Sequence, residues 1–367
     1  STAAWVTTSP TAIPSEEGNS SLSTVNAQIA SDVNIGAVDQ VLNPGDQEAV
    51  RNKWNMPGAN VEPIGDDVAL KKFLGTGVSG GTAGSNTIGV LTKDITLTIA
   101  GAGDLGSSTF YGILDGNGHK ITINYTAGDL TVDRRVFLNA NNDGIKANLA
   151  NGHHSASPDL EGIWSTGLLT GANRGTIANL VIDYTSNMAM PTVVNGDNVT
   201  GGMSLLSGDE PQYISTYGIV TGANFGTIDN VRINVTDDFV GRQQASHVNA
   251  QEPWGAQANR NSRSWENTAI AGTLAGILVS GTVSNTYVDL GDGVTVGAFA
   301  DGQRRGGNTF AAWRNGVAIS GGMVGFFIGN DGSLIDSYLS GTGTVAAIVG
   351  RGDANGAGKG YNAFSGG

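Results

Sequence analysis

Four copies of one two-strand segment recur along the chain, and this repetition limits its fold more than any other feature. Residues 167–185 (GLLTGANRGTIANLVIDYT) and 218–236 (GIVTGANFGTIDNVRINVT) are identical at 11 of 19 positions. A third copy spans 272–290, and a fourth, with a longer insertion, spans 321–341. One such segment cannot bury its own apolar face, so the repeats are expected to stack on one another around a shared core.

Each copy consists of two short predicted strands joined by a glycine-rich turn. β-Branched residues dominate both segments, which favours strand over helix. Two glycines recur in every copy, and the second glycine of each pair returns after 51, 55 and 51 residues. The recurring glycines are Gly171, Gly175, Gly222, Gly226, Gly276, Gly281, Gly325 and Gly332. We expect Gly175 and Gly226 to adopt positive φ at corners where a Cβ atom would clash.

These patterns predict an all-β chain folded as a right-handed parallel β-helix, or β-solenoid, with long lateral loops. Segments 88–99 and 113–125 are expected to form the first coils, with a tight turn at residues 115–118 (DGNG). A sandwich of β-hairpins is the alternative. The β-helix is favoured because stacked repeats bury one continuous core.

The predicted β-helix occupies residues 61–367 and follows an N-terminal arm, residues 1–60. Residues 63–74 are predicted to form a short amphipathic helix that begins at the N-cap Asp66 and covers the first coil. The apolar side chains expected on one side of this helix are Val68, Leu70 and Leu74.

Long polar insertions separate the repeats, at 138–166, 186–217, 237–271 and 291–320. If the repeats stack in register, these insertions are expected to leave the β-helix on the same side.

Composition indicates an exported protein and excludes some partners. Only 14% of the residues are charged, 57 are glycine, none is cysteine, and the net charge is −13. A net negative charge disfavours nucleic-acid binding, which requires a basic face. No segment approaches the ~20 apolar residues of a membrane helix, so no membrane span is expected. A chain that begins at Ser1 is consistent with removal of a signal peptide.

Three patterns resemble the GLUG-type repeat proteins of bacterial surfaces and secretions. They are Gly-Thr-Ile-x-Asn followed by an apolar strand, the run LDGNGHKI at 114–121, and the run LTKDITL at 91–97 after a short helix. Together they cover roughly residues 60–345 in patches. The resemblance implies a right-handed parallel β-helix in large exported proteins, including adhesins. It implies a scaffold and no activity.

Acidic residues recur beside glycine and make calcium a candidate cofactor, because Ca²⁺ takes several carboxylate and carbonyl oxygens. They are Asp115, Asp143, Asp292, Asp331 and Asp353. No particular ligands are assigned, and no full calcium-binding motif is present. Adjacent His153 and His154 are expected to lie in a solvated loop rather than to bind a metal.

A polysaccharide lyase or glycosidase is the enzymatic alternative. The carboxylates that could serve it are Asp183, Asp229, Asp289 and Asp336. They lie near equivalent positions of the repeats, and a repeated polar position is normally part of the scaffold, whereas a catalytic pair is unique. No catalytic residue is therefore assigned.

Tryptophans in the arm and the insertions are the predicted contacts to a protein interface or a glycan, because an exposed indole can stack on a sugar ring. They are Trp5, Trp254, Trp265 and Trp313. Residues 1–14 could also add a strand to a neighbouring subunit.

The sequence thus predicts a non-enzymatic structural or adhesive protein that is secreted or displayed on a cell surface, in a layer, filament or matrix. Its expected partner is a second copy of itself, with a glycan or a cell surface as a further partner. A glycan- or host-binding passenger domain remains the other alternative to an enzyme.

Overall fold

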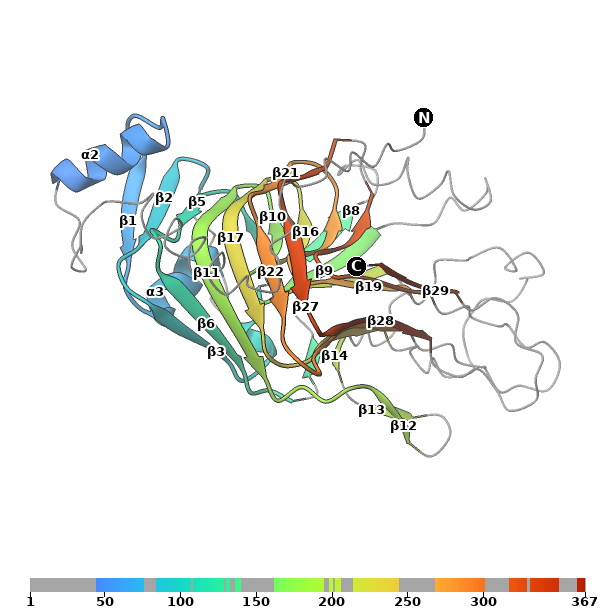
Figure 1. Cartoon of the computed structure of the whole chain (residues 1–367). Helices are drawn as coiled ribbons and strands as arrows, with labels where there is room; N and C mark the ends of the chain where they lie inside the picture. The colour runs from blue at the N-terminus through green and yellow to red at the C-terminus, as the bar shows by residue number, and fades with distance from the viewer. Residues whose placement is uncertain are drawn as a thin grey trace, which may run out of the picture.

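The chain forms a parallel β-helix (Figure 1), as the sequence predicts. The structure, a computed structural model, describes residues 44–75, 84–106, 108–128, 130–132, 136–139, 162–194, 198–200, 202–205, 214–243, 268–300, 317–328, 331–349 and 362–366.

Four sheets run along the helix axis, and each successive coil adds to each sheet. Sheet A contains β1 (Asn60–Ile64), β2 (Thr87–Leu91), β3 (Ile95–Ile99), β5 (Ile113–Asp115), β6 (Lys120–Tyr125), β11 (Thr176–Ser186), β17 (Thr227–Val235), β21 (Thr282–Ser284), β22 (Tyr287–Leu290), β26 (Ser333–Ile335) and β27 (Tyr338–Gly341). Sheet B contains β8 (Val136–Asn139), β9 (Gly162–Gly167), β15 (Ile214–Gly218), β19 (Thr268–Gly272), β24 (Val317–Gly321) and β29 (Asn362–Gly366). Sheet C contains β4 (Thr109–Phe110), β10 (Thr170–Asn173), β16 (Thr221–Asn224), β20 (Ala275–Leu278) and β25 (Val324–Phe327). Sheet D contains β7 (Leu130–Val132), β14 (Met203–Leu205), β18 (Phe239–Gln243), β23 (Thr295–Ala300) and β28 (Thr344–Val349).

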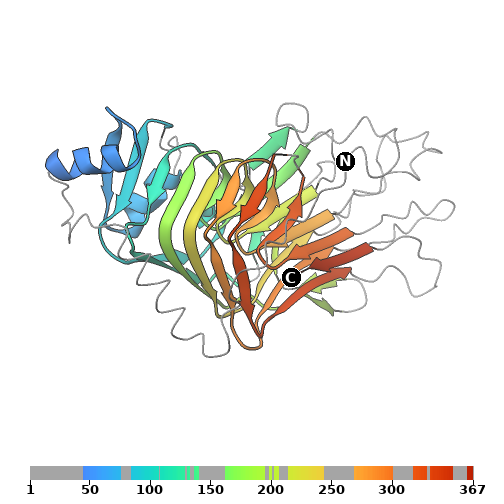
Figure 2. The same ribbon diagram turned by 45° about the horizontal axis from the view of Figure 1, so that its top comes forward.

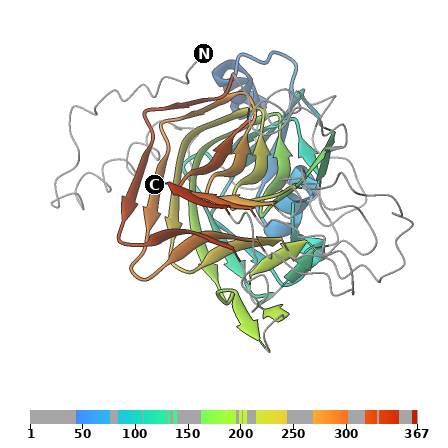
Figure 3. The same ribbon diagram turned by 90° about the vertical axis from the view of Figure 1, so that its right-hand side faces the viewer.

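All strand pairs of these sheets are parallel except β8 with β9. A separate antiparallel hairpin projects from the coil, formed by β12 (Thr192–Val194) and β13 (Asn198–Thr200). Viewed from the C-terminal end (Figure 3), the chain winds anticlockwise as it advances toward the viewer, which is the right-handed sense. Right-handed crossovers are the rule for parallel strands.

The attachment points of the long insertions lie on one side of the β-helix, as expected. In four successive coils the chain passes from sheet D to sheet B through residues 206–213, 244–267, 301–316 and 350–361, which lie outside the described residues. The strand ends on both sides of these segments stack above one another (Figure 2).

Register is kept by columns of aliphatic side chains that point into the core. Ile177 lies beside Ile228, and Ile228 beside Val283, and all three are completely buried. Parallel strands pair about 4.8 Å apart, so equivalent side chains contact one another along the axis. A one-residue slip would turn every one of these side chains toward solvent.

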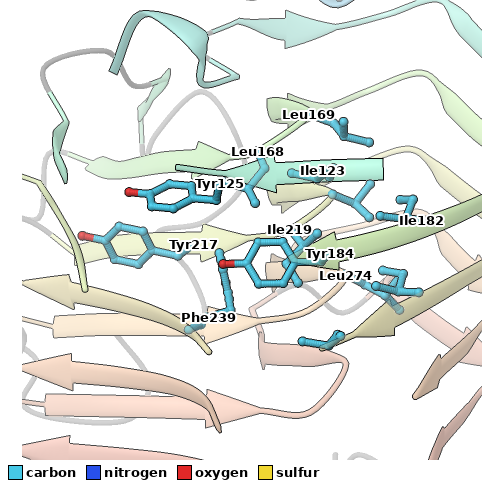
Figure 4. Close-up of a cluster of buried hydrophobic side chains, with 14 of the residues drawn as sticks. Ile123, Tyr125, Leu168, Leu169, Ile182, Tyr184, Tyr217, Ile219, Phe239 and Leu274 are labelled. Carbon is cyan, nitrogen blue, oxygen red and sulfur yellow. The ribbon is translucent and has the colours of Figure 1, made fainter. Parts of the chain in front are cut away.

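Aromatic side chains fill the wide part of the core between sheets A, B and D (Figure 4). Tyr125, Tyr184, Tyr217 and Phe239 are completely buried. The rings of Tyr184 and Phe239 meet edge to face, 5.8 Å apart. The Tyr184 hydroxyl donates to the carbonyl oxygen of Asp238, and burial raises the pKa of this tyrosine.

The recurring glycines are required by close contact between coils. A Cβ atom on Gly175 would lie 2.0 Å from the carbonyl oxygen of Gly112, and one on Gly226 would lie 2.1 Å from that of Gly175. The expected clash is therefore present. The prediction that Gly175 and Gly226 adopt positive φ is wrong, because in this column only Gly281 does, with φ +79°.

The other recurring glycines lie inside strands rather than at turns. They are Gly171, Gly222, Gly276 and Gly325, in β10, β16, β20 and β25. A Cβ atom on Gly222 would lie 2.3 Å from the Ser165 hydroxyl, and one on Gly325 would lie 2.6 Å from the carbonyl oxygen of Ala271. Sheets B and C approach too closely along this line for any side chain.

A column of asparagines adopts the left-handed conformation that was expected of glycine. One residue per coil has positive φ where sheet A bends: Asn117, Asn179, Asn230, Asn285 and Asp336. Asparagine tolerates this conformation because its short polar side chain forms local hydrogen bonds. The Asn230 amide donates to the Asn179 side-chain oxygen at 2.9 Å, and the Asn179 amide donates to Asp115 at 3.1 Å.

Two helices lie at the N-terminal end, α2 (Pro44–Lys53) and α3 (Asp67–Leu74). The predicted N-cap of α3 is confirmed, since the Asp66 carboxylate accepts a hydrogen bond from the Ala69 amide at 2.8 Å. Leu70, Phe73 and Leu74 are buried against the first coils.

Three expectations for this end were wrong. Pro63 belongs to β1 rather than to the helix, because the chain pairs with β2 before it turns. Val68 is 70% exposed, and Phe73 takes the buried position instead. Part of the segment predicted as an arm forms helix α2.

The glycine column gives a stability test. Gly226→Ala places a methyl group against the backbone of the coil below, so the free energy of unfolding should fall by roughly 1–3 kcal/mol. Gly103→Ala, where a Cβ atom meets nothing within 4 Å, should change it by less than about 0.5 kcal/mol. Equal effects in chemical denaturation would contradict the steric explanation.

The asparagine column gives a second test. Asn230→Ala forces an ordinary side chain into the left-handed region and removes a hydrogen bond, which should cost on the order of 2 kcal/mol. Asn230→Gly loses the hydrogen bond but keeps the backbone unstrained, so it should cost about half as much. Thermal unfolding of both variants measures the difference, and a more stable alanine variant would refute the conformational argument.

Candidate functional site

The last coil, formed by β25 to β29, exposes side chains that earlier coils bury. Leu334 continues the buried column of Ile228 and Val283 but is 39% exposed. Phe364 on β29 lies beside Ile319, which is 6% exposed, yet it is itself 58% exposed. The large hydrophobic side chains exposed in the described residues are Val68, Tyr111, Phe327, Leu334, Ile335, Tyr338 and Phe364, and five of these seven belong to the last coil.

The last coil also ends each sheet. β25, β26, β27, β28 and β29 each pair with one described strand only, that of the preceding coil. One edge of every strand therefore presents backbone N–H and C=O groups to no other described strand. Such edges are templates for pairing with another chain.

Near the opposite end of the β-helix, one buried carboxylate joins helix α2 to the coils. Asp115 is completely buried. Its side chain accepts hydrogen bonds from Lys53 at 2.9 Å and from the Trp54 indole at 2.8 Å. It also accepts from the backbone N–H of Asn117 at 3.0 Å and from the side-chain amide of Asn179 at 3.1 Å. A buried charge is stable only when it is paired in this way. Asp115 thus joins the last residue of α2 and the residue after it to the asparagine column.

Helix α3 is joined to the coils by a second ion pair. Lys71 donates to Asp104 at 2.8 Å. Partial burial alone would raise the pKa of Asp104, but the hydrogen bond and charge of Lys71, together with hydrogen bonds from the backbone of Ala100 and Gly101, outweigh it and lower this pKa.

The outer face of sheet A carries a row of polar contacts that crosses the coils. Lys120 pairs with Asp183 at 2.9 Å, and the hydrogen bond from this pairing raises the pKa of Lys120. Asn234 donates to Asp183 at 2.5 Å. Ser340 donates to Asp289 at 3.1 Å. Each contact joins neighbouring coils, so this row stabilises the stack.

The structure separates the four carboxylates considered for catalysis. Asp183 and Asp289 share one column of sheet A, with Asn234 between them. Asp229 lies in another column, where Ser284 and Asn285 donate to it at 2.6 and 2.8 Å. Asp336 is at the bend, in the asparagine column. The four are therefore not at equivalent positions, and three of them accept hydrogen bonds from neighbouring coils.

The predicted contact tryptophans, Trp5, Trp254, Trp265 and Trp313, lie outside the described residues, as do His153 and His154. Within the described residues, no group of three or more histidines and carboxylates is arranged to hold a metal ion. No described helix has the length and apolar character needed to span a membrane.

The exposed apolar residues of the last coil were missed as a group. A signal for them exists, because the fourth repeat retains apolar residues at core positions and residues 342–367 contain no further copy. The roles of Lys53 and Trp54 had no comparable signal, since their partner lies 62 and 61 residues away.

Comparisons of the sequence with models of protein families and with curated proteins, and of the fold with solved structures, find no match.

The buried carboxylate gives a further stability test. Lys53→Met removes the cation that pairs with buried Asp115, so the free energy of unfolding should fall by on the order of 2 kcal/mol. Lys72→Met, at an exposed position of α3, is the control and should be nearly neutral. Denaturation curves that coincide for the two variants would show that Asp115 does not depend on Lys53.

Proposed function

We propose that this chain is a non-enzymatic structural or adhesive protein of an extracellular layer, filament or matrix, and that it associates with copies of itself through its last coil. The observation that carries this proposal is that one end of the stack combines exposed apolar side chains with strand edges that pair with no other described strand. At the other end of the same stack, α2 packs against β1 and α3 against β3.

Both features of the last coil favour association. Exposed apolar side chains gathered at one end of a molecule are typical of interaction sites, and their burial is favourable by about 25 cal/mol per Å². Unpaired backbone edges add directional hydrogen bonds. Charge opposes neither effect strongly, because Asp331 and Asp336 are the only charged residues in 317–349.

Composition supports an extracellular location. The chain has no cysteine, is rich in glycine, and only 14% of its residues are charged. The resemblance to GLUG-type repeat proteins supports the same location. Calcium as a cofactor and a glycan or cell surface as a second partner remain predictions from the sequence.

The enzymatic alternative finds no specific support in the described residues. A glycosidase needs two carboxylates facing one sugar site. Asp183 and Asp289 instead form hydrogen bonds that hold neighbouring coils together.

Sedimentation of the purified chain tests the proposal. The wild type should form species larger than the monomer as its concentration rises. Phe364→Lys places a charge on the exposed end and should weaken association by roughly tenfold or more, because a buried phenylalanine contributes about 1.5–3 kcal/mol. Val68→Lys is the matched control, since Val68 is also exposed, at 70%, but on α3.

A wild-type chain that stays monomeric at high concentration, with Ca²⁺ present, would refute self-association. A ligand-binding or enzymatic role would then be favoured.

A further inference from the structure

The two ends of the β-helix differ in their capacity to add a strand. In β1, the backbone N–H of Asn60 donates to the carbonyl oxygen of Asn86 at 3.0 Å. The carbonyl oxygen of Ile64 accepts from the backbone N–H of Thr92 at 3.0 Å. Both residues therefore direct their backbone groups toward β2. Backbone groups alternate between the two edges of a strand, so those of Val61 and Pro63 face the free edge.

Pro63 has no N–H group, so the free edge of β1 offers one donor, that of Val61. Proline on an edge strand is a common device against strand addition. Growth of the stack by pairing on β1 is therefore disfavoured.

Strand β28 has the opposite character. The backbone N–H of Thr344 donates to the carbonyl oxygen of Val294 at 2.7 Å. The backbone groups of Thr344 therefore face the preceding coil. By alternation, Val345, Ala347 and Val349 direct both N–H and C=O away from it. Among the described strands, β28 pairs with β23 alone. Its sequence, TVAAIV, contains no charge, proline or glycine, and such segments pair readily.

We propose that two copies of this chain join tail to tail, with their β28 strands paired antiparallel about a two-fold axis at Ala347. This inference rests on the proposed self-association and names the contact that produces it. In this arrangement Ala347 lies opposite Ala347 of the second copy, and Val345 lies opposite Val349. Each of the three outward residues then exchanges both backbone hydrogen bonds with its counterpart.

Self-complementarity makes a second copy the occupant. A row of three residues with outward donors and acceptors matches its own antiparallel image, which is the condition for an isologous interface. The side chains of Val345, Ala347 and Val349 lie in columns that point to the core. Pairing would bring the open cores of both copies together. β28 contains no charged residue, so no like charges would meet when two copies of it pair.

This contact differs from the expectation that residues 1–14 of a neighbour supply the added strand. A two-fold contact also closes on itself. The last coil alone therefore yields dimers, and growth into a layer, filament or matrix needs a second contact elsewhere on the chain. Pairing of the last coil on β1 would instead yield open filaments.

Ala347→Pro tests the contact directly. It removes an N–H group that faces away from β23, so the pairing inside the chain is retained. The dissociation constant of the dimer should rise by roughly tenfold or more, because two symmetry-related hydrogen bonds are lost. Val61→Pro, which removes the remaining outward donor of β1, is the matched control and should leave association unchanged. Circular dichroism and thermal unfolding verify that both variants are folded.

A cysteine cross-link tests the geometry independently of any folding defect. Directly opposite residues that exchange both hydrogen bonds have Cα atoms about 5.5 Å apart, within disulfide range. The chain contains no cysteine, so Ala347→Cys should give one covalent dimer under mild oxidation and nothing larger. Ala346→Cys, which lies opposite Ile348 of the second copy, should cross-link far more slowly.

Several results would overturn the two-fold contact while leaving self-association intact. They are association that Ala347→Pro does not weaken, association without a cross-link at position 347, and loss of association when residues 1–14 are deleted. The last result would identify the arm as the occupant. A wild-type chain that is monomeric at every concentration would refute the two-fold contact and the proposed function together.

Discussion

Close contact between the backbones of successive coils is the constraint on which the rest of the structure depends. At the glycine columns, a carbonyl oxygen of one coil occupies the space where a Cβ atom of the next would lie, as at Gly175 and Gly226. Contact at this distance fixes the register of every coil relative to its neighbour. Fixed register then places Ile177 on Ile228 in the core and Asn179 beside Asn230 at the bend. Each residue type at a repeated position therefore follows from what the coil below presents.

The sequence was sufficient to predict this stacking, because its evidence is periodic. The spacing of the glycines gave the period, and β-branched residues indicated strands. The sequence was misleading where two physical causes have the same signature. A recurring glycine can reflect positive φ or close approach, and at Gly226 the cause is close approach. Positive φ belongs to Asn179 and Asn230, which were interpreted only as part of a motif. The contact of Lys53 with Asp115 could not be predicted, since neither residue repeats and the fold alone brings them together.

The candidate site was predictable only in outline. The site lies on the coil that contains the fourth repeat, which the pattern identifies as a coil like the three before it. Its exposed side chains can be predicted only when the register is known. Leu334 has the pattern of a core residue, but it is exposed because no described coil stacks on it. The direction of the backbone groups of β28 likewise depends on which residue of the strand faces β23, and one hydrogen bond decides it. The tryptophans chosen from the sequence depend on segments outside the described residues.

The two ends of the asparagine column show how the stack distinguishes its termini. At the N-terminal end Asn179 donates to Asp115, whose carboxylate is completely buried and is paired with Lys53. At the other end the column finishes at Asp336, whose side chain is exposed. Each asparagine amide donates toward the N-terminal coil, as Asn230 does to Asn179. A carboxylate cannot donate, so Asp336 forms no such bond to Asn285. Asn285 itself donates to Asp229 rather than to Asn230. The last coil is thus held by its backbone ladder with little help from this column, and its outward edge is the part of the stack with most to gain from a partner.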